Sequence, residues 1–388
     1  MNFEYDEAQQ KAVAAFRAFC DETVRPVDDL LESAGALESA AKIRANLRAV
    51  AGAGGLGWNF PKTVGGRGLS LLETVAYVEA VGQASPATLV ALDSSVGLAA
   101  AAIAAYGNED QKKRYLPRLL DGSLLGAFAV TEWEAGSDVA GIKTAAVREG
   151  EGWEVYGQKA MIANAPLADV VVFLAVTKAA ATPPGLSLFV ANKGTKGLVA
   201  GPPLETMGLH GLAVGEIQFE GCLLPAGALL GTENQGAAML ADLMAQAKIT
   251  LAAGCVGVAS RIAADALAYA GTRKAFGKPI FNYQEVSFKF ADMRTMIDGA
   301  RLLCQYTAWL RDRGDREVPE LAACAKLFAS ESLTWIAQAG LAVHGGLGYL
   351  KKCAMERLYR DARYFEIGLG TSELQRVQIA RAELDRYR

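Results

Sequence analysis

Gly126-Ala-Phe-Ala-Val-Thr-Glu-Trp-Glu-Ala-Gly-Ser-Asp138 is the stretch at which the pattern of the chain changes. Residues 1–120 before it are rich in Ala, and their apolar residues recur every three to four positions, which is typical of amphipathic helices. From about Leu124 to Val214, short runs rich in Val, Ile, Phe and Trp alternate with Gly, Pro and Asn, which indicates strands joined by turns. Helical patterns return from about Gly236 to the end. The chain is therefore expected to be helical, then β, then helical.

This order defines an α+β fold with three expected domains. Residues 1–120 form an N-terminal helical domain, 121–230 a middle β-barrel or sandwich domain, and 231–388 a C-terminal four-helix bundle. The apolar runs of the middle part predict strands in an antiparallel barrel or sandwich, at Trp153–Tyr156, Val170–Val176, Leu186–Val190 and Glu216–Phe219. The bundle is predicted from four long stretches with a helical apolar stripe, at Met239–Ala270, Tyr283–Arg313, Pro319–Gly340 and Thr371–Arg388.

Composition excludes several classes of function. The 388 residues are 52% hydrophobic with a net charge of −3, so the chain is expected to fold and is a poor partner for nucleic acid. Six cysteines without CxxC spacing and only two histidines favour reduced thiols and no metal site. The acidic N-terminus does not resemble a signal peptide, and the apolar stretch Val96–Tyr106 is short for a membrane span. We expect a cytoplasmic protein without a membrane span.

One apparent nucleotide-binding motif lacks the strand that such a motif requires before it. Gly52-Ala-Gly54-Gly55-Leu-Gly57 matches GxGxxG, but a helical pattern precedes it where a dinucleotide fingerprint needs a strand. A helix end followed by a turn is the better interpretation.

Three separated motifs together resemble the acyl-CoA dehydrogenase family. The opening stretch 126–138 resembles the family's TEPxAGSD signature. Arg273-Lys-Ala-Phe276-Gly277-Lys-Pro-Ile with Gln284 resembles RxxFGxxI…Q, and Arg360-Asp361 followed by Gly370-Thr371 resembles RD…GT. They occur in the family's order, and the resemblance covers essentially the whole chain.

The resemblance implies FAD bound between the β domain and the bundle, and a homotetramer. Phe128, Val130 and Thr131 would face the flavin, and Ser137 would lie near both FAD and the substrate. Arg273, Phe276 and Gln284 would reach the FAD of a neighbouring subunit, with Arg273 on the pyrophosphate. The alternative for Arg273 and Gln284 is an ordinary place on the helix surface. Further residues complete the expected cofactor cradle: Met161, Ala163, Gly345, Gly346, Thr371 and Glu373.

The sequence departs from the family at the catalytic base. The usual Glu before the C-terminal Gly-Thr is replaced by Leu369, within Gly368-Leu369-Gly370-Thr371. The alternative position for this base, on the first long helix of the C-terminal domain, is Ala247. Leu369 keeps only its backbone N–H, which could polarise the thioester carbonyl. Met161 and Ala163 stand where the family has Trp and Thr or Ser beside the flavin, so the redox properties are expected to differ.

Asp93 is the candidate for a replacement base. It lies on an expected helix from Pro86 to Tyr106, which lines the acyl pocket in the resemblance, among apolar neighbours. A carboxylate on such a stripe is costly unless it is paired or functional, and its burial would raise its pKa. The structural alternative is that Asp93 bonds locally to Ser94 or Ser95. A base at this depth suits a γ C–H and 1,4-elimination on a cyclic ester such as cyclohex-1-ene-1-carboxyl-CoA, as in variant family members of anaerobic alicyclic and aromatic metabolism.

Other groups and functions stay open. Gly368, where a Tyr is usual, would leave room for a ring, and Lys248 either contacts CoA or lies on the helix face. Glu366 and Glu373 are lesser candidates for the base, and Glu132 is expected to be structural. The expected electron acceptor is an electron-transferring flavoprotein or a similar partner. The rival functions are another flavin enzyme on this fold (oxidase, monooxygenase or desulfinase) and a non-catalytic subunit. Neither the acyl group nor the acceptor follows from the sequence.

Overall fold

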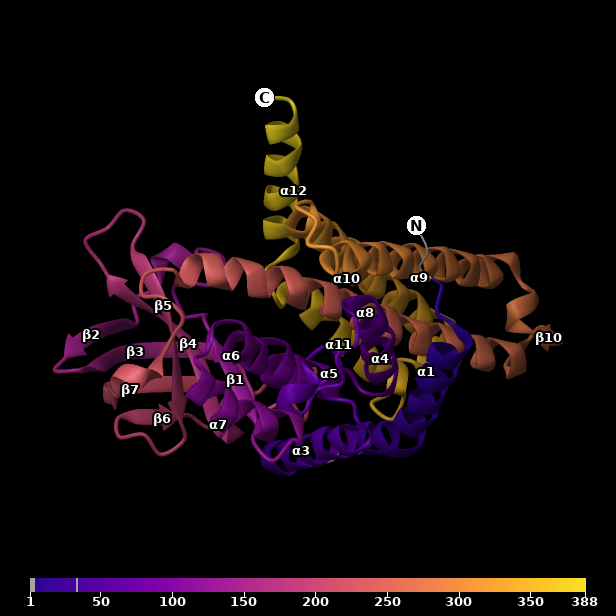
Figure 1. The fold of residues 1–388 in the computed structure, drawn as a ribbon. Helices are drawn as coiled ribbons and strands as arrows, with labels where there is room; N and C mark the ends of the chain where they lie inside the picture. Colours follow the sequence, from indigo (N-terminus) through magenta and orange to yellow (C-terminus); the bar gives the residue numbers. More distant parts are fainter. Residues whose placement is uncertain (1–3, 33) are drawn as a thin grey trace.

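The computed structural model describes residues 4–32 and 34–388. Helices and a middle sheet follow one another in the expected order, and the sheet lies at one end of an elongated helical body (Figure 1). The N-terminal part contains the helices α1 (Glu7–Phe19), α2 (Arg25–Asp28), α3 (Ala36–Gly52), α4 (Leu71–Ala84), α5 (Pro86–Leu92), α6 (Ala101–Tyr106) and α7 (Glu109–Leu120).

Local sequence signals explain several helix ends. Ser70 Oγ caps α4 by accepting from the backbone N–H of Glu73, and the Glu73 carboxylate accepts from the backbone N–H of Ser70, which together form a capping box. The α3 helix ends at Gly52 and a turn with Gly54 in the left-handed region follows, which confirms that the GxGxxG match is a helix end. The expected helix from Pro86 to Tyr106 is continuous, but its middle, η3 (Asp93–Ala100), is a π-helix.

The middle part is one mixed sheet. Its strands are β1 (Gly126–Ala129), β2 (Ala145–Glu149), β3 (Gly152–Ala163), β4 (Val170–Lys178), β5 (Gly185–Asn192), β6 (Leu198–Ala200), β7 (Val214–Leu224) and β8 (Leu229–Leu230). The order is β6-β7-β3-β2-β4-β5-β8, with β1 beside β4. The expected strands are all present, but the purely antiparallel arrangement is wrong, because β1 and β2 both run parallel to β4.

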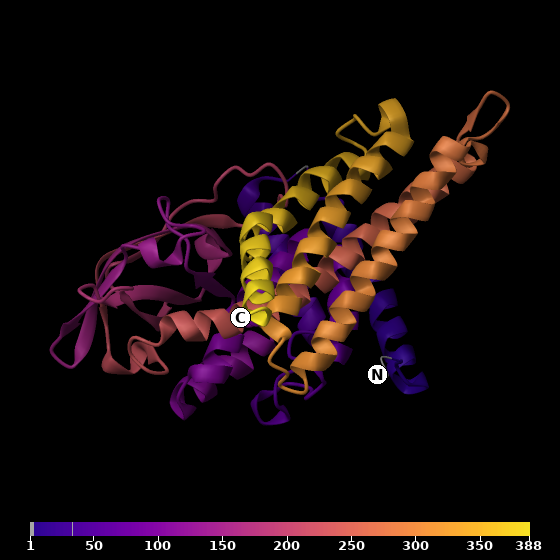
Figure 2. The same ribbon diagram turned by 90° about the horizontal axis from the view of Figure 1, so that it is seen from above.

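The C-terminal part is a bundle of long helices (Figure 2). It comprises α8 (Gly236–Thr272), α9 (Gln284–Arg311), α10 (Val318–His344), α11 (Ala354–Ile367) and α12 (Ser372–Arg386). The sequence predicted all of these except α11. A hairpin of β9 (Lys274–Ala275) and β10 (Lys278–Pro279) lies at the end of the bundle far from the sheet (Figure 1).

Two helical stretches are long and apolar enough to cross a membrane by length and composition alone, so the expectation that the apolar stretch is too short is wrong. They are Pro86–Tyr106 and α8, and 89% and 67% of their most apolar windows are buried inside the protein. Such burial is that of core helices, and both helices contribute to the main hydrophobic core.

A buried ionic network ties the N-terminal helices to the bundle. Asp28 of α2 is 1% exposed, and its carboxylate accepts from Arg261 of α8 at 2.9 Å and Arg357 of α11 at 2.6 Å. The neighbouring Arg360 donates to the carbonyl of Met207, and Asp361 accepts from the backbone N–H of Leu209. The Arg360-Asp361 motif thus attaches a loop of the middle part to α11.

Candidate functional site

Asp93 lies at the junction of α5 and η3, with its side chain inside the protein. It is 6% exposed, and its Oδ1 accepts a hydrogen bond of 3.1 Å from Thr250 Oγ1 on α8. A Cβ at Gly97, one turn later, would lie 2.5 Å from the same oxygen, so glycine makes room for the carboxyl. Burial raises the pKa of Asp93 to about 7, although the bond from Thr250 acts in the opposite direction. π-Helical turns are frequent at functional sites.

The two serines after Asp93 are bonded elsewhere. Ser94 Oγ donates to the carbonyl of Ala163 on β3, and Ser95 Oγ accepts from the backbone N–H of Gly126 on β1. Asp93 is therefore bonded across to α8 and not to its own helix, which contradicts the local alternative. The same contacts join this helix to the strands that carry the expected flavin neighbours.

Tyr364 of α11 lies near both Asp93 and Gly368. Burial raises the pKa of the Tyr364 phenol, and the negative charge of Asp93 raises it further. A Cβ at Gly368 would lie 2.8 Å from Cζ of Tyr364. The missing side chain of Gly368 therefore leaves space that the Tyr364 ring occupies, so the room expected for a substrate ring at Gly368 is filled at least in part by the protein itself.

The loop with Leu369 is held from two helices. Lys326 of α10 is fully buried, and its amino group donates to the carbonyls of Glu366 at 2.9 Å and Gly370 at 2.8 Å. The side-chain amide of Gln375 donates to the carbonyl of Gly370 at 2.9 Å. Leu369 has φ +56°, a strained left-handed conformation for a branched residue. Strain of this kind persists only where the surroundings hold it, and it concentrates at functional sites.

The expected flavin neighbours gather at the end of the sheet nearest η3. Phe128 is on β1, Val130 and Thr131 follow it, and Met161 and Ala163 end β3. The segments are joined because the N–H of residue 160 donates to the carbonyl of Thr131 at 2.9 Å. Ser137 is exposed on the loop that follows.

Glu132 and Lys159 stiffen this region. The fully buried Lys159 donates to Glu132 at 2.8 Å and to the carbonyl of Val130 at 2.9 Å, and Glu132 also accepts from the N–H groups of Lys143 and Thr144. Burial alone would raise the pKa of Glu132, but these hydrogen bonds together hold it below its usual value. The structural interpretation of Glu132 is confirmed.

The second set of residues expected to bind the cofactor lies at the opposite end of the molecule. Arg273, Phe276 and Gln284 surround the β9–β10 hairpin (Figure 1). Gly345 and Gly346 follow His344, whose ring stacks on Tyr269 four residues before Arg273. Within one chain, the two sets therefore lie apart.

The residues present fit a large flat cofactor. Met161 is 59% exposed at φ +57°, and Phe276 is 98% exposed at φ +47°. Two large apolar side chains held outward on strained backbone are surfaces that a ring system would cover. Arg273 adds an exposed guanidinium suited to a pyrophosphate.

The remaining candidates are bonded to other side chains or exposed. Lys248 is buried and donates to Gln378 of α12 at 2.7 Å, and burial lowers its pKa to about 8. The carboxylate of Glu366 is paired with Arg363, and Glu373 is exposed at the start of α12, which Thr371 caps. A role of Lys248 toward CoA stays a prediction.

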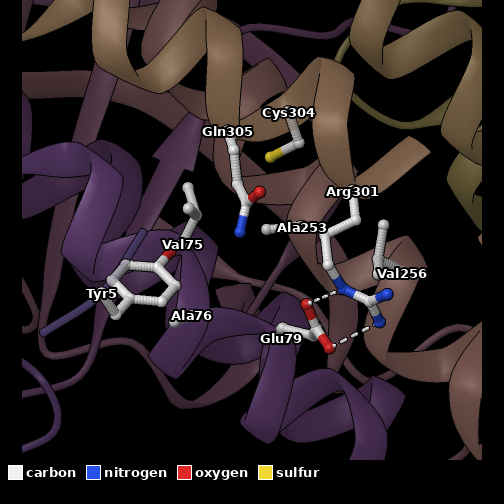
Figure 3. Close-up of a pocket in the computed structure, with 9 residues that line it drawn as sticks. All are labelled: Tyr5, Val75, Ala76, Glu79, Ala253, Val256, Arg301, Cys304 and Gln305. Atoms are coloured by element: carbon white, nitrogen blue, oxygen red, sulfur yellow. Dashed lines mark hydrogen bonds and ion pairs between the residues drawn. The ribbon is translucent and has the colours of Figure 1, made fainter. Parts of the chain in front are cut away.

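A separate pocket lies between the N-terminal segment and the bundle, and none of the predicted site residues line it (Figure 3). It is lined by Tyr5, α4, α8 and α9. Glu79 and Arg301 form a two-bond ion pair across it, at 3.0 and 3.1 Å. The bonded polar side chains of this pocket connect α4 to α9.

Sequence reasoning missed Thr250, Tyr364, Lys326 and Gln375. Tyr364 could have been found, because it lies four residues before Gly368, the residue that directly follows α11. The other three act across helix contacts that only the packed bundle defines.

Comparisons with known proteins agree with this geometry. The N-terminal, middle and C-terminal domain models of acyl-CoA dehydrogenase match residues 6–123, 127–222 and 234–384. Probable acyl-CoA dehydrogenase YngJ of Bacillus subtilis (strain 168) is 36% identical over 382 residues, covering 98% of this chain and 99% of that protein. The caffeyl-CoA reductase-Etf complex subunit CarC of Acetobacterium woodii is 35% identical over 327 residues, covering 84% and 86%.

Solved structures give the same result. Butyryl-CoA dehydrogenase from Megasphaera elsdenii superposes with a TM-score of 0.92 at 29% identity, covering 99% of this chain and 100% of that one. The FAD complex of PigA superposes with a TM-score of 0.92 at 26% identity over the full length of both chains. This chain belongs to the acyl-CoA dehydrogenase family, the FAD-dependent oxidoreductases that act on CH–CH groups of acyl-CoA thioesters.

Proposed function

We propose that this enzyme dehydrogenates an acyl-CoA thioester with Asp93 as the base. The observation that carries the proposal is the buried Asp93 carboxyl, bonded to Thr250 and close to Tyr364, in a chain with Leu369 and Ala247 at the two usual base positions. Carbon acids need a proton acceptor within reach, and a base works best when its pKa lies near the working pH. Burial places the pKa of Asp93 at about 7.

The backbone around Leu369 would orient the thioester. Its N–H would donate to the thioester carbonyl and stabilise the negative charge that develops as the proton leaves. This role needs no carboxylate at position 369, only a fixed loop. Lys326 and Gln375 supply that support through the carbonyl of Gly370.

The substrate that suits this arrangement is an α,β-unsaturated cyclic ester such as cyclohex-1-ene-1-carboxyl-CoA. Asp93 would take a proton from the γ carbon, and the electron pair would delocalise through the double bond to the carbonyl. Bound FAD supplies the acceptor, at N5, for the hydride that leaves a second ring carbon. The ester loses one proton and one hydride and becomes a conjugated diene. Gly368, Tyr364 and Ser137 would border the substrate.

The cellular setting is part of the proposal. The separation of Arg273 and Phe276 from Phe128 and Met161 supports an oligomer, a homotetramer in our proposal, in which each FAD touches two chains. CarC, by its name part of an Etf complex, supports an electron-transferring flavoprotein as the acceptor. We place the enzyme in the cytoplasm.

The test is turnover of cyclohex-1-ene-1-carboxyl-CoA by FAD-loaded wild type and Asp93→Asn, with a ferrocenium-type acceptor. We expect a loss of about 10²- to 10⁴-fold, the usual contribution of a general base. Asp385→Asn, the same change at an exposed carboxylate outside every predicted site, is the matched control and should retain activity. Unchanged turnover in Asp93→Asn refutes the base role.

The substrate and the rivals are tested with the same wild-type protein. Straight, branched and cyclic CoA esters are compared for anaerobic bleaching of the flavin. Oxygen consumption with hydroxylated product would favour an oxidase or monooxygenase. FAD-loaded protein that turns over none of the esters would favour a non-catalytic subunit.

A further inference from the structure

The Thr250 hydroxyl has one proton to donate and two hydrogen-bond acceptors within reach. Its Oγ1 lies 3.1 Å from Asp93 Oδ1 and 3.0 Å from the carbonyl oxygen of Ala247, one turn back on α8. A hydroxyl has a single O–H but two acceptor lone pairs. It can therefore donate to only one of these oxygens at a time, while it remains able to accept.

We propose that Thr250 is a positioning residue that reverses its hydrogen bond with the protonation state of Asp93. When Asp93 is ionised, Thr250 donates to the carboxylate. When Asp93 has taken a proton, the new carboxylic acid donates to Thr250 Oγ1, and the Thr250 proton turns to the carbonyl of Ala247. This inference rests on the proposed function of Asp93.

The reversal matters because this carboxyl is buried. A buried polar group without a partner is destabilising, and a partner that could only donate would leave the O–H of the protonated acid unpaired. A hydroxyl backed by a helix carbonyl satisfies both states without movement of heavy atoms. The geometry thereby holds Asp93 in one orientation before and after proton transfer.

Few ionisable side chains on the elements around Asp93 could replace Thr250 as its hydrogen-bond partner. From α11, Tyr364 is the ionisable neighbour whose pKa Asp93 perturbs. From α8, the amino group of Lys248 is bonded to Gln378. On α7, which also packs on η3, Lys113, Arg114 and Arg118 are exposed and Tyr115 is buried. β1 carries no ionisable side chain.

Removal of the hydroxyl should weaken the ionised state more than the neutral one, because hydrogen bonds to charged groups are the stronger ones. The experiment compares FAD-loaded wild type with Thr250→Val, which keeps the shape, and Thr250→Ser, which keeps the hydroxyl. Thr307→Val is the matched control, a fully buried threonine that also donates to its own helix, at Leu303. The readouts are the pH profile of kcat/KM and the infrared titration of the Asp93 carboxyl, identified by its absence in Asp93→Asn.

We expect Thr250→Val to raise the apparent pKa in both readouts by about one pH unit, a roughly tenfold loss of kcat/KM on the acidic side. Thr250→Ser and Thr307→Val should match wild type. An unshifted pKa in Thr250→Val overturns this inference. If Asp93→Asn is nevertheless inactive, the proposed function of Asp93 still stands. If Thr250→Val does not fold, a shifted pKa in Thr250→Ser overturns the inference and a wild-type value supports it. An active Asp93→Asn overturns both proposals.

Discussion

The amino group of Lys326 lies 2.8 Å from the carbonyl oxygen of Gly370, across 44 residues of sequence. The same amino group also donates to the carbonyl of Glu366, in the last turn of α11. A single buried lysine thus fixes both ends of the loop that contains Leu369. The position of the Leu369 N–H therefore depends on a buried residue of α10.

Lys326→Met keeps the length of the side chain and removes both bonds. We expect kcat to fall by about 10²-fold, the usual cost of a small misplacement of an orienting group. FAD absorbance should be retained. Lys289→Met, at an exposed helix pair with Glu285, serves as the control. An unchanged kcat in Lys326→Met would mean that the loop holds its shape without this cation.

Gly97→Ala tests the placement of the Asp93 carboxyl. The new Cβ would lie 2.5 Å from Oδ1, so the carboxyl must turn. We expect a loss of about 10- to 100-fold in turnover. Alanine favours helices over glycine, so a loss of helix stability cannot explain this result. Gly271→Ala on α8, where the new Cβ meets open space, should have wild-type activity. Full activity in Gly97→Ala would contradict the placement of Asp93.

The pH dependence of stability provides an independent measure of Asp93 burial. Burial raises its pKa from 3.8 to about 7, so the folded state binds the proton more tightly than the unfolded state. The resulting stability is fully present below pH 3.8 and is lost as the pH rises through 7. Asn stays neutral, so Asp93→Asn should gain stability relative to wild type between pH 5 and 8, by at most about 4 kcal/mol. Thermal unfolding of the FAD-loaded proteins measures this, and a difference that does not vary with pH would contradict it.

Asp28→Asn tests the network between the N-terminal helices and the bundle. The change removes the buried carboxylate that Arg261 and Arg357 share and leaves them only the half-exposed Asp29, and breaking a buried pair typically costs about 3–5 kcal/mol. Denaturant unfolding of the holoenzyme should show this loss. Asp385→Asn, from an exposed pair with Arg388, should be neutral. Equal stability of the two variants would mean that the network contributes little.

The sequence was sufficient for the order of elements because long apolar stripes and strand runs are local signals. It failed at α11, where the charged residues Arg357 and Asp361 lie on the buried face and bond to Asp28 and to the N–H of Leu209, so that charges stand where an apolar stripe is expected. It also failed for the strand directions, because β1 and β2 pair with β4 through contacts far apart in the chain.

The site could be predicted in part. Asp93 was identifiable because a lone carboxylate among apolar residues is conspicuous, and its burial is confirmed. Its partner Thr250 was not, since the distance between η3 and α8 depends on packing that no local pattern encodes. The sequence likewise did not show that the Tyr364 ring lies against Gly368, in the space that was expected to be open.

The central claim is that Asp93 removes a proton from the substrate. The most direct test is deuterium uptake by cyclohex-1-ene-1-carboxyl-CoA in heavy water, under anaerobic conditions and without an electron acceptor. Wild type should introduce deuterium at the γ carbon, and FAD-loaded Asp93→Asn should not. Equal uptake at that carbon by both proteins would contradict the account.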